Sequence, residues 1–191
     1  YRREDLAEFA GRHYSGQRNH IHKFRKLYPD AEYVPLTAAD EPLLERFWQD
    51  YGAEFSKESA IAKNELRLAK EMLRHLAGDW FMAGGLLHEG RLVAISMGEQ
   101  CGSTMQVHIE KALYSYPGAY PTMVQEFARH CDDSVRWMNR EDDARDKGLR
   151  MSKMQYLPAA LGGKLCFEVG SELDRLHEIP TLHSDRLTLD A

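Results

Sequence analysis

Residues 80–113 contain three apolar segments separated by two short turns, and this pattern constrains the fold more than any other part of the chain. The segments cover 80–88, 91–100 and 104–113, and the turns contain Glu89-Gly90 and Gly102-Ser103. Turns of this length join neighbouring antiparallel strands. We therefore predict a three-stranded antiparallel meander in the middle of the chain.

The rest of the chain alternates between helical and extended patterns. Helices are predicted over 4–9, 17–28, 40–51, 57–76, 120–131 and 144–156, and further strands over 32–36, 135–139 and 164–169. On the helix at 17–28, Ile21, Phe24 and Leu27 are expected to face inward. Pro35 assigns the first strand to a sheet edge. Helices that connect strands of a mixed sheet define an α/β or α+β fold.

The charge balance and the cysteines limit the class of protein. The chain has 191 residues, 29% of them charged, and a net charge of −5, so a general affinity for polyanions is not expected. The cysteines Cys101, Cys131 and Cys166 form no CxxC pair, which indicates free thiols and a cytoplasmic location. No apolar run is long enough for a membrane span, and the start at Tyr1 has no signal-peptide pattern.

The motif "NREDD" follows the strand at 135–139 and precedes a helix, where α/β sheets usually bind ligands. Its candidate substrate-binding residues are Asn139, Arg140, Glu141 and Asp142. Glu141 or Asp142 can hold an ammonium group, and Arg140 can hold a carboxylate or phosphate. Alternatively, Asp142 and Asp143 cap the next helix, and for Asp143 we favour the cap.

The segment "GLRMSKMQYLP" supplies a second set of candidates. Arg150 and Lys153 lie three residues apart and are predicted to share a helix face, where they can contact phosphates. Tyr156 is the candidate proton donor, because a tyrosine pKa near 10 suits an acid better than a base at neutral pH. The alternative is a half-buried tyrosine before Pro158.

The strand "VHIEKA" carries two titratable side chains. Strict alternation places Val107, Ile109 and Lys111 on one face and His108 and Glu110 on the other. Either His108 or Glu110 can accept a proton from an amine, and we take Glu110 as a candidate catalytic residue. Alternatively, Glu110 pairs with the arginine of the "NREDD" motif. Lys111 is included among the candidate substrate-binding residues.

The segment "GQRNHIHKF" (16–24) has several readings. His20 and His22 are two residues apart and face different sides of a helix, which argues against a metal site. The surrounding basic residues can contact a nucleic acid or form a solvated face. We take Arg18, Asn19 and His20 as candidate substrate-binding residues.

A Pro-Gly turn in "SYPGAY" precedes the helix at 120–131. A helix N-terminus offers free N–H groups to an anion, which makes Gly118, Ala119 and Tyr120 a candidate phosphate loop. The alternative is a purely structural turn.

Three motifs in order, at 17–24, 107–112 and 139–158, resemble the C-terminal domain family of bacterial phosphatidylglycerol lysyltransferases. The resemblance runs from about residue 4 to about residue 170. It implies a GNAT-like acyl-CoA N-acyltransferase fold with a mostly antiparallel mixed sheet, and it makes this chain the second lobe of a tandem protein. The resemblance implies that the first GNAT-like lobe is absent from this chain. The arm at 1–30 is expected to join the two lobes before a GNAT-like domain at 31–170 and a tail at 171–191.

The resemblance also implies a reaction. Family enzymes move an aminoacyl group from charged tRNA to a lipid headgroup, whereas GNAT relatives move an acyl group from coenzyme A to an amine. The "YPGAY" loop has one glycine and departs from the Gly-rich pyrophosphate loop of coenzyme A users, so we favour an aminoacyl donor over acyl-CoA. No other cofactor is assigned. The alternatives are an acyl-CoA-dependent N-acyltransferase and a non-catalytic module that binds a ligand.

Overall fold

The structure is a computed structural model that describes residues 1–54, 60–74, 80–141, 143 and 147–163. Residues Tyr1–Ala160 form one compact unit. The strand expected over 164–169 and the tail expected over 171–191 lie outside the described residues. The division of the chain at residues 30 and 170 stays a prediction.

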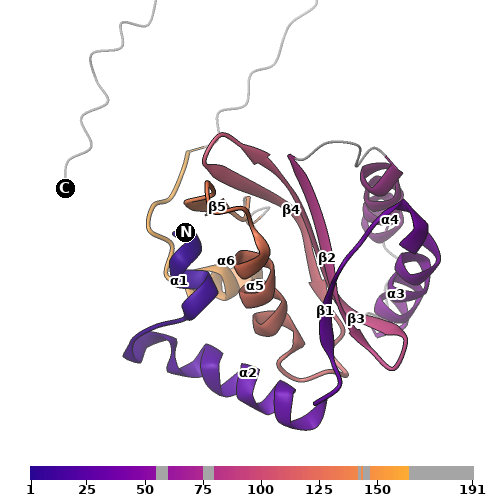
Figure 1. Ribbon diagram of the computed structural model, residues 1–191, viewed down its shortest axis with the longest axis horizontal. Helices are drawn as coiled ribbons and strands as arrows, with labels where there is room; N and C mark the ends of the chain where they lie inside the picture. The colour runs from indigo at the N-terminus through magenta and orange to yellow at the C-terminus, as the bar shows by residue number, and fades with distance from the viewer. Residues whose placement is uncertain (55–59, 75–79, 142, 144–146, 164–191) are drawn as a thin grey trace, which may run out of the picture. The chain divides into compact units, whose positions relative to one another are not determined.

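The unit up to Ala160 is built on a five-stranded sheet whose strands follow one another in chain order (Figure 1). The first four strands are antiparallel, and the fifth runs parallel to the fourth. The strands are β1 (Glu32–Pro35), β2 (Phe81–His88), β3 (Arg91–Cys101), β4 (Thr104–Ala112) and β5 (Trp137–Asn139). The predicted meander, the mixed sheet and the edge position of β1 are confirmed.

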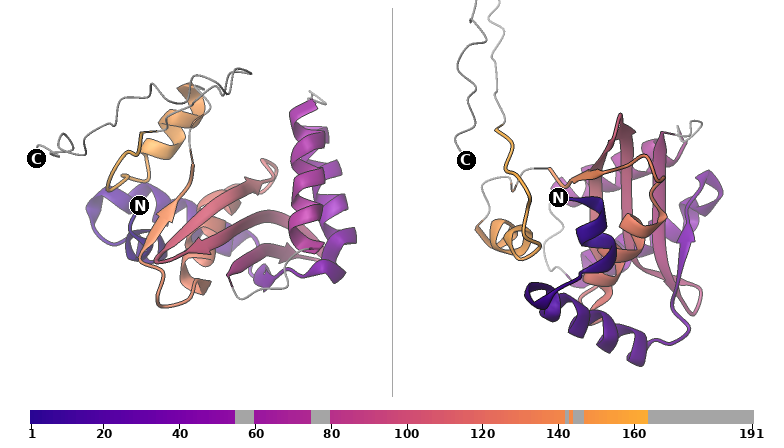
Figure 2. Two further views of the ribbon diagram at one scale, coloured as in Figure 1. Left: turned by 90° about the horizontal axis from the view of Figure 1, so that it is seen from above. Right: turned by 60° about the vertical axis from the view of Figure 1, so that its left-hand side comes forward.

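Helices cover both faces of this sheet (Figures 1 and 2). One face carries α1 (Arg3–Glu8), α2 (Ser15–Leu27) and α5 (Ala119–His130), and the other carries α3 (Glu41–Glu54) and α4 (Ala60–Arg74). The last described helix, α6 (Lys147–Met154), follows β5. The start of the chain pairs with the end of the sheet, because Arg2 forms an antiparallel bridge with Trp137.

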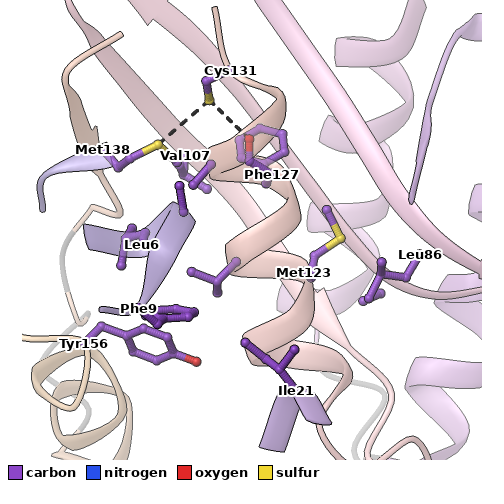
Figure 3. Close-up of a cluster of buried hydrophobic side chains, with 14 of the residues drawn as sticks. Leu6, Phe9, Ile21, Leu86, Val107, Met123, Phe127, Cys131, Met138 and Tyr156 are labelled. Carbon is purple, nitrogen blue, oxygen red and sulfur yellow. Dashed lines mark hydrogen bonds between the residues drawn. The ribbon is translucent and has the colours of Figure 1, made fainter. Parts of the chain in front are cut away.

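The core beneath α5 joins segments that are distant in sequence. Figure 3 shows Leu6 and Phe9 near the α5 residues Met123 and Phe127, and all four side chains are fully buried. Burial of one such side chain stabilises the fold by about 1.5–3 kcal/mol. The inward position predicted for Leu27 is wrong, since 51% of it is exposed. Leu27 lies six residues after the buried Ile21, which corresponds to a rotation of about 240° around the helix. Its side chain therefore points away from the buried face of α2.

A β-bulge at His108 overturns the predicted alternation along β4. Met97 pairs with Ile109 while the next residue, Gly98, pairs with Val107, so His108 is an extra residue in β4. Val107 therefore packs beneath α5, whereas Ile109 packs in the cluster beneath α3 and α4. The predicted shared face of these two residues is wrong, because a bulge inverts the side-chain order beyond it.

Candidate functional site

The candidate site lies where β4 and β5 separate. Their parallel pairing covers three residue pairs, from Thr104–Trp137 to Gln106–Asn139. β4 then continues to Ala112, while β5 ends. We call the region between the second half of β4 and the chain after Asn139 the strand divergence. The "NREDD" motif begins at this point, at the carboxyl end of β5.

A buried cluster, which we call the Arg140 group, occupies the inner side of the strand divergence. The Arg140 Nε donates a hydrogen bond to the Glu110 carboxylate at 2.9 Å, and their side chains are only 2% and 9% exposed. The hydroxyl of Tyr120 donates to Glu110 at 2.9 Å and accepts from Arg140 at 2.7 Å. The guanidinium also lies 4.4 Å from the ring centre of Tyr156 and 5.3 Å from that of Tyr1. Four separate segments therefore meet around one cation.

Electrostatics keep Arg140 charged and the hydroxyl groups of Tyr120 and Tyr156 protonated. Burial acts to lower the pKa of Arg140, but the neighbouring Glu110 carboxylate and tyrosines hold it above its usual value. Burial raises the pKa of Tyr156, and Arg140 opposes that shift. Burial, followed by the Glu110 carboxylate, raises the pKa of Tyr120 well above 10. Both tyrosines are therefore neutral hydroxyl groups at physiological pH.

One donor of the Arg140 group is unused. The Nη1 atom of Arg140 is buried and has no hydrogen-bond partner among the described residues. An unsatisfied buried donor costs about 1–3 kcal/mol, and more when the group is charged. Such a donor is therefore a candidate contact for an acceptor atom that enters the strand divergence.

A second cluster, the His108 group, occupies the solvent-facing side. His108 Nδ1 lies 2.7 Å from the Glu141 carboxylate, and its Nε2 lies 3.5 Å from the Glu99 carboxylate. Glu141 has a φ of 55°, a left-handed conformation that is uncommon outside glycine, and its N–H donates to the side chain of Asn139. Asn139 donates in turn to Gln106 at 2.7 Å. Adjacent residues, Arg140 and Glu141, thus serve different clusters.

The α6 candidates have separate contacts. Lys153 Nζ donates to the backbone carbonyls of Arg140 at 2.5 Å and Glu141 at 3.2 Å, which ties α6 to the strand divergence. Arg150 instead pairs with Asp143 and is 67% exposed. Of these two candidates, the structure brings only Lys153 to the site.

The α2 candidates lie apart from both clusters. Arg18 Nη1 donates to the backbone carbonyls of Phe9 and Gly11 at 2.5 and 2.6 Å, which holds α2 against the segment that precedes it. Asn19 and His20 are exposed on α2.

The candidate phosphate loop packs closely against α2. Gly118 begins α5 with a φ of 90°, and a Cβ there would lie 2.2 Å from the backbone oxygen of His20. Ala119 is fully buried, and the side chain of Tyr120 belongs to the Arg140 group. Glycine is therefore required at 118 for a close helix contact as well as for its backbone conformation.

A carboxylate from α3 binds the start of the same loop. The Glu54 side chain accepts hydrogen bonds from the backbone N–H groups of Tyr114 and Ser115 at 2.5 and 3.2 Å. Consecutive backbone N–H groups of this kind commonly bind anions. In this structure the anion is a side chain of the protein itself.

Two further candidates lie elsewhere. Lys111 lies over the ring of Tyr51 in α3, 5.7 Å from its centre, and therefore on the opposite face of the sheet from Glu110. Asp142 lies outside the described residues.

Sequence reasoning missed Glu99, Gln106 and Tyr1. Glu99 is the register partner of Gln106 in the β3–β4 hairpin, so the tight turn at Gly102-Ser103 could have placed the two side by side. We find no sequence signal for Tyr1, since its contact with Arg140 arises only from the pairing of the two ends of the chain.

None of the helices in the described ranges is both long and apolar enough to cross a bilayer. Among the same residues, no group of three or more His, Cys, Asp or Glu side chains could hold a metal ion.

Comparisons with known proteins agree with this geometry. The family model described as phosphatidylglycerol lysyltransferase, C-terminal, matches residues 1–166. A conserved protein of unknown function from Bacteroides thetaiotaomicron VPI-5482 is 34% identical with a TM-score of 0.73, and the match covers 84% of this chain and 55% of that protein. This chain therefore spans about half the length of that relative. No curated protein matches the chain.

More distant structures share the fold. A ribosomal-protein-alanine N-acetyltransferase from Brucella melitensis biovar Abortus 2308 is 15% identical with a TM-score of 0.54, covering 73% of this chain and 99% of that one. A possible acetyltransferase from Clostridium difficile 630 is 12% identical with a TM-score of 0.54, covering 73% and 97%. The predicted GNAT-like fold is confirmed.

Proposed function

Because the chain belongs to the family of phosphatidylglycerol lysyltransferase C-terminal domains, we propose that it takes part in acyl or aminoacyl transfer at the strand divergence. Such catalysis depends mainly on holding the donor carbonyl and the acceptor in line. A buried cation surrounded by side chains from four other segments is suited to that task.

The buried pair of Arg140 and Glu110 is the observation that carries this proposal. Burying two charges is expensive, and hydrophobic residues of similar volume often serve stability as well or better. Perturbed ionisable groups of this kind cluster at functional sites. The Nη1 of Arg140, which has no partner among the described residues, can donate a hydrogen bond to a carbonyl or phosphate oxygen of the acyl-donor substrate.

We assign two roles within the Arg140 group. Tyr156 is the proton donor to the leaving group, since its hydroxyl is protonated at neutral pH and its ring centre lies 4.4 Å from the Arg140 guanidinium. Glu110, engaged by Arg140 and Tyr120, acts through them as a positioning residue. The entrance through which the substrate reaches the strand divergence is then lined by Asn139, Glu141 and Lys153.

For the donor we favour an aminoacyl group over acyl-CoA. The loop that would meet the pyrophosphate of coenzyme A already holds the Glu54 carboxylate at Tyr114 and Ser115. Its glycine, Gly118, is covered by the α2 backbone. A diphosphate would have to displace a carboxylate, whereas an aminoacyl ester needs no pyrophosphate site.

Charged tRNA is the proposed source of that group, and the acceptor is an amine or hydroxyl such as a lipid headgroup. Exposed Asn19 and His20 and the basic residues of α2 are proposed to contact the donor. A tRNA donor places the reaction in the cytoplasm. A second lobe, supplied outside this chain, would complete the site, in keeping with the greater length of the Bacteroides relative.

The test is a donor comparison by isothermal titration and single-turnover assay. The probes are charged tRNA, a short aminoacyl-adenosine mimic and acetyl-coenzyme A. We expect binding of the mimic, weak or no binding of acetyl-coenzyme A, and a Tyr156→Phe protein that binds normally but transfers at least about 100-fold more slowly. Tyr114→Phe is the matched control, since Tyr114 is 76% exposed. Tight binding of acetyl-coenzyme A with no response to the mimic would overturn the donor assignment.

A non-catalytic binding module is the second candidate. It is favoured by the Arg140 group itself, whose side chains already occupy the strand divergence. Binding of the aminoacyl mimic without transfer, both alone and in the presence of a complementary lobe, would support this alternative.

A further inference from the structure

His108 lies between two carboxylates, and its two ring nitrogens face different ones. If Nδ1 carries the proton, it donates to Glu141 at 2.7 Å, and Nε2 then presents a lone pair toward the Glu99 carboxylate 3.5 Å away. Two acceptors that face each other repel unless a donor lies between them. In this tautomer, an N–H group of a ligand that enters between Nε2 and Glu99 can donate to both acceptors.

We propose that His108 Nε2 and the Glu99 carboxylate bind the amine of the acyl acceptor, and that His108 is the general base for its attack. The inference rests on the proposed transferase function and adds to it the acceptor class, a primary amine, and the base. Two N–H bonds of one amino group can reach Nε2 and Glu99 together, which a single hydroxyl proton cannot do.

The surroundings of His108 favour a positively charged or neutral ligand over an anion. Among the described residues, the charged groups that pair with it are the carboxylates of Glu99 from β3 and Glu141 beyond β5. Lys153 from α6 is directed to the backbone oxygens of Arg140 and Glu141. The thiol of Cys101 lies 4.0 Å from the Glu99 carboxylate. The local charge is therefore complementary to an amine.

Glu110 is less suited to the same role. Its side chain is 9% exposed and is engaged by both Arg140 and Tyr120. His108 is 25% exposed, so a ligand in solvent can reach its imidazole. A base must reach the acceptor and release its proton afterwards, which an exposed imidazole does more readily than a buried ion-paired carboxylate.

The transfer step balances with these groups. The neutral amine attacks the acyl carbon, an N–C bond forms, and the carbonyl electron pair moves to oxygen. One amine proton passes to His108 Nε2, while Glu141 stabilises the imidazolium through Nδ1. When the intermediate collapses, the bond to the leaving group breaks and the leaving group takes the proton of Tyr156. The imidazolium then returns its proton to Tyr156 through solvent, so no proton is gained or lost overall.

The amine site can be tested without any donor, by 15N NMR of the histidine side chains. Ethanolamine is the probe, and tetramethylammonium, which has the charge but no N–H group, is the control. We expect ethanolamine, but not tetramethylammonium, to shift the His108 Nε2 resonance. Glu99→Gln should weaken its binding about tenfold, as for a lost charge-assisted hydrogen bond, while Glu8→Gln on exposed α1 should not. Equal responses to both cations, or none, would overturn the amine site.

The base is tested by the pH dependence of kcat. His108→Gln should lower kcat by at least about 100-fold and remove the acidic limb of the profile, whereas exposed His22→Gln should keep both rate and limb. Wild-type rate and profile in His108→Gln would disprove the base while leaving the transferase function intact. If the wild-type chain transfers no acyl group from any donor, the proposed transferase function is disproved. The NMR titration still shows whether His108 and Glu99 bind an amine. Circular dichroism identifies an unfolded variant, and Glu141→Gln then supplies the same pH test.

Discussion

The Arg140 group and the His108 group occupy the same strand divergence, yet their environments differ sharply. The side chains of Arg140 and Glu110 are 2% and 9% exposed, whereas those of His108 and Glu141 are 25% and 49% exposed. Arg140 and Glu141 are neighbours in sequence. Their separation shows how one strand end can supply a buried charge to the interior and an exposed charge to the solvent-facing side.

Two local backbone features produce this difference. The bulge at His108 places an extra residue in β4, and the positive φ of Glu141 turns the chain just after Arg140. Buried charges must keep their partners because desolvation is costly, while exposed pairs contribute little to stability. The inner group is therefore expected to govern stability and the outer group to govern proton transfer.

The largest expected effect comes from Arg140→Met. Removing the cation leaves the Glu110 carboxylate buried without its counter-charge, which should lower the free energy of unfolding by about 3–5 kcal/mol. Urea unfolding followed by circular dichroism measures this change. The double variant Arg140→Met with Glu110→Gln should recover part of the loss, because no charge is then left unpaired. A double variant as unstable as the two single changes added together would show that the pair is not coupled.

A smaller loss is expected from Tyr120→Phe. The Tyr120 hydroxyl donates to Glu110 and accepts from Arg140, so its removal leaves two buried charged groups short of a hydrogen bond. We expect a loss of about 1–3 kcal/mol in the free energy of unfolding. Tyr114→Phe is the exposed control and should change the urea midpoint little. A Tyr120→Phe protein as stable as wild type would mean that the Tyr120 hydrogen bonds to Glu110 and Arg140 do not contribute to stability.

Much of the fold was readable from the sequence, because turn lengths and apolar periods are local signals. The meander at 80–113 and the edge position of β1 follow from glycine turns and Pro35, and both are confirmed. The pairing of Glu110 with Arg140 was one of two alternatives, and the structure contains it.

The parts that the sequence could not supply depend on local irregularities of the backbone and on tertiary contacts. Nothing in "VHIEKA" signals the bulge at His108, and strict alternation therefore assigned Val107 and Ile109 to one face. The contact of Tyr1 with Arg140 needs the bridge between Arg2 and β5. Arg18 was taken as a substrate contact, but its guanidinium binds the backbone of Phe9 and Gly11.

The apolar core beside the Arg140 group should lose stability at alkaline pH. Cys131 lies in this core, in the same cluster as Tyr156 (Figure 3). Burial raises the pKa of the Cys131 thiol from about 9 to about 12. Its folded pKa is above the unfolded value, so this stabilisation is complete below pH 9 and is lost as pH rises toward 12. We expect a loss of about 1 kcal/mol between pH 9 and 10. Cys131→Ala should flatten this slope in urea titrations, and exposed Cys101→Ala should not.

The smallest expected effect on stability is that of Glu141→Gln. This change removes the charge beside His108 but keeps the size of the side chain and its backbone N–H bond to Asn139. Because Glu141 is 49% exposed, water can replace the lost interaction, and the free energy of unfolding should change by less than about 0.5 kcal/mol. Urea unfolding at pH 7 measures this change. A loss comparable with that of Tyr120→Phe would make the His108 group a structural element like the Arg140 group. A small loss together with an altered pH profile of transfer would separate the two groups by role.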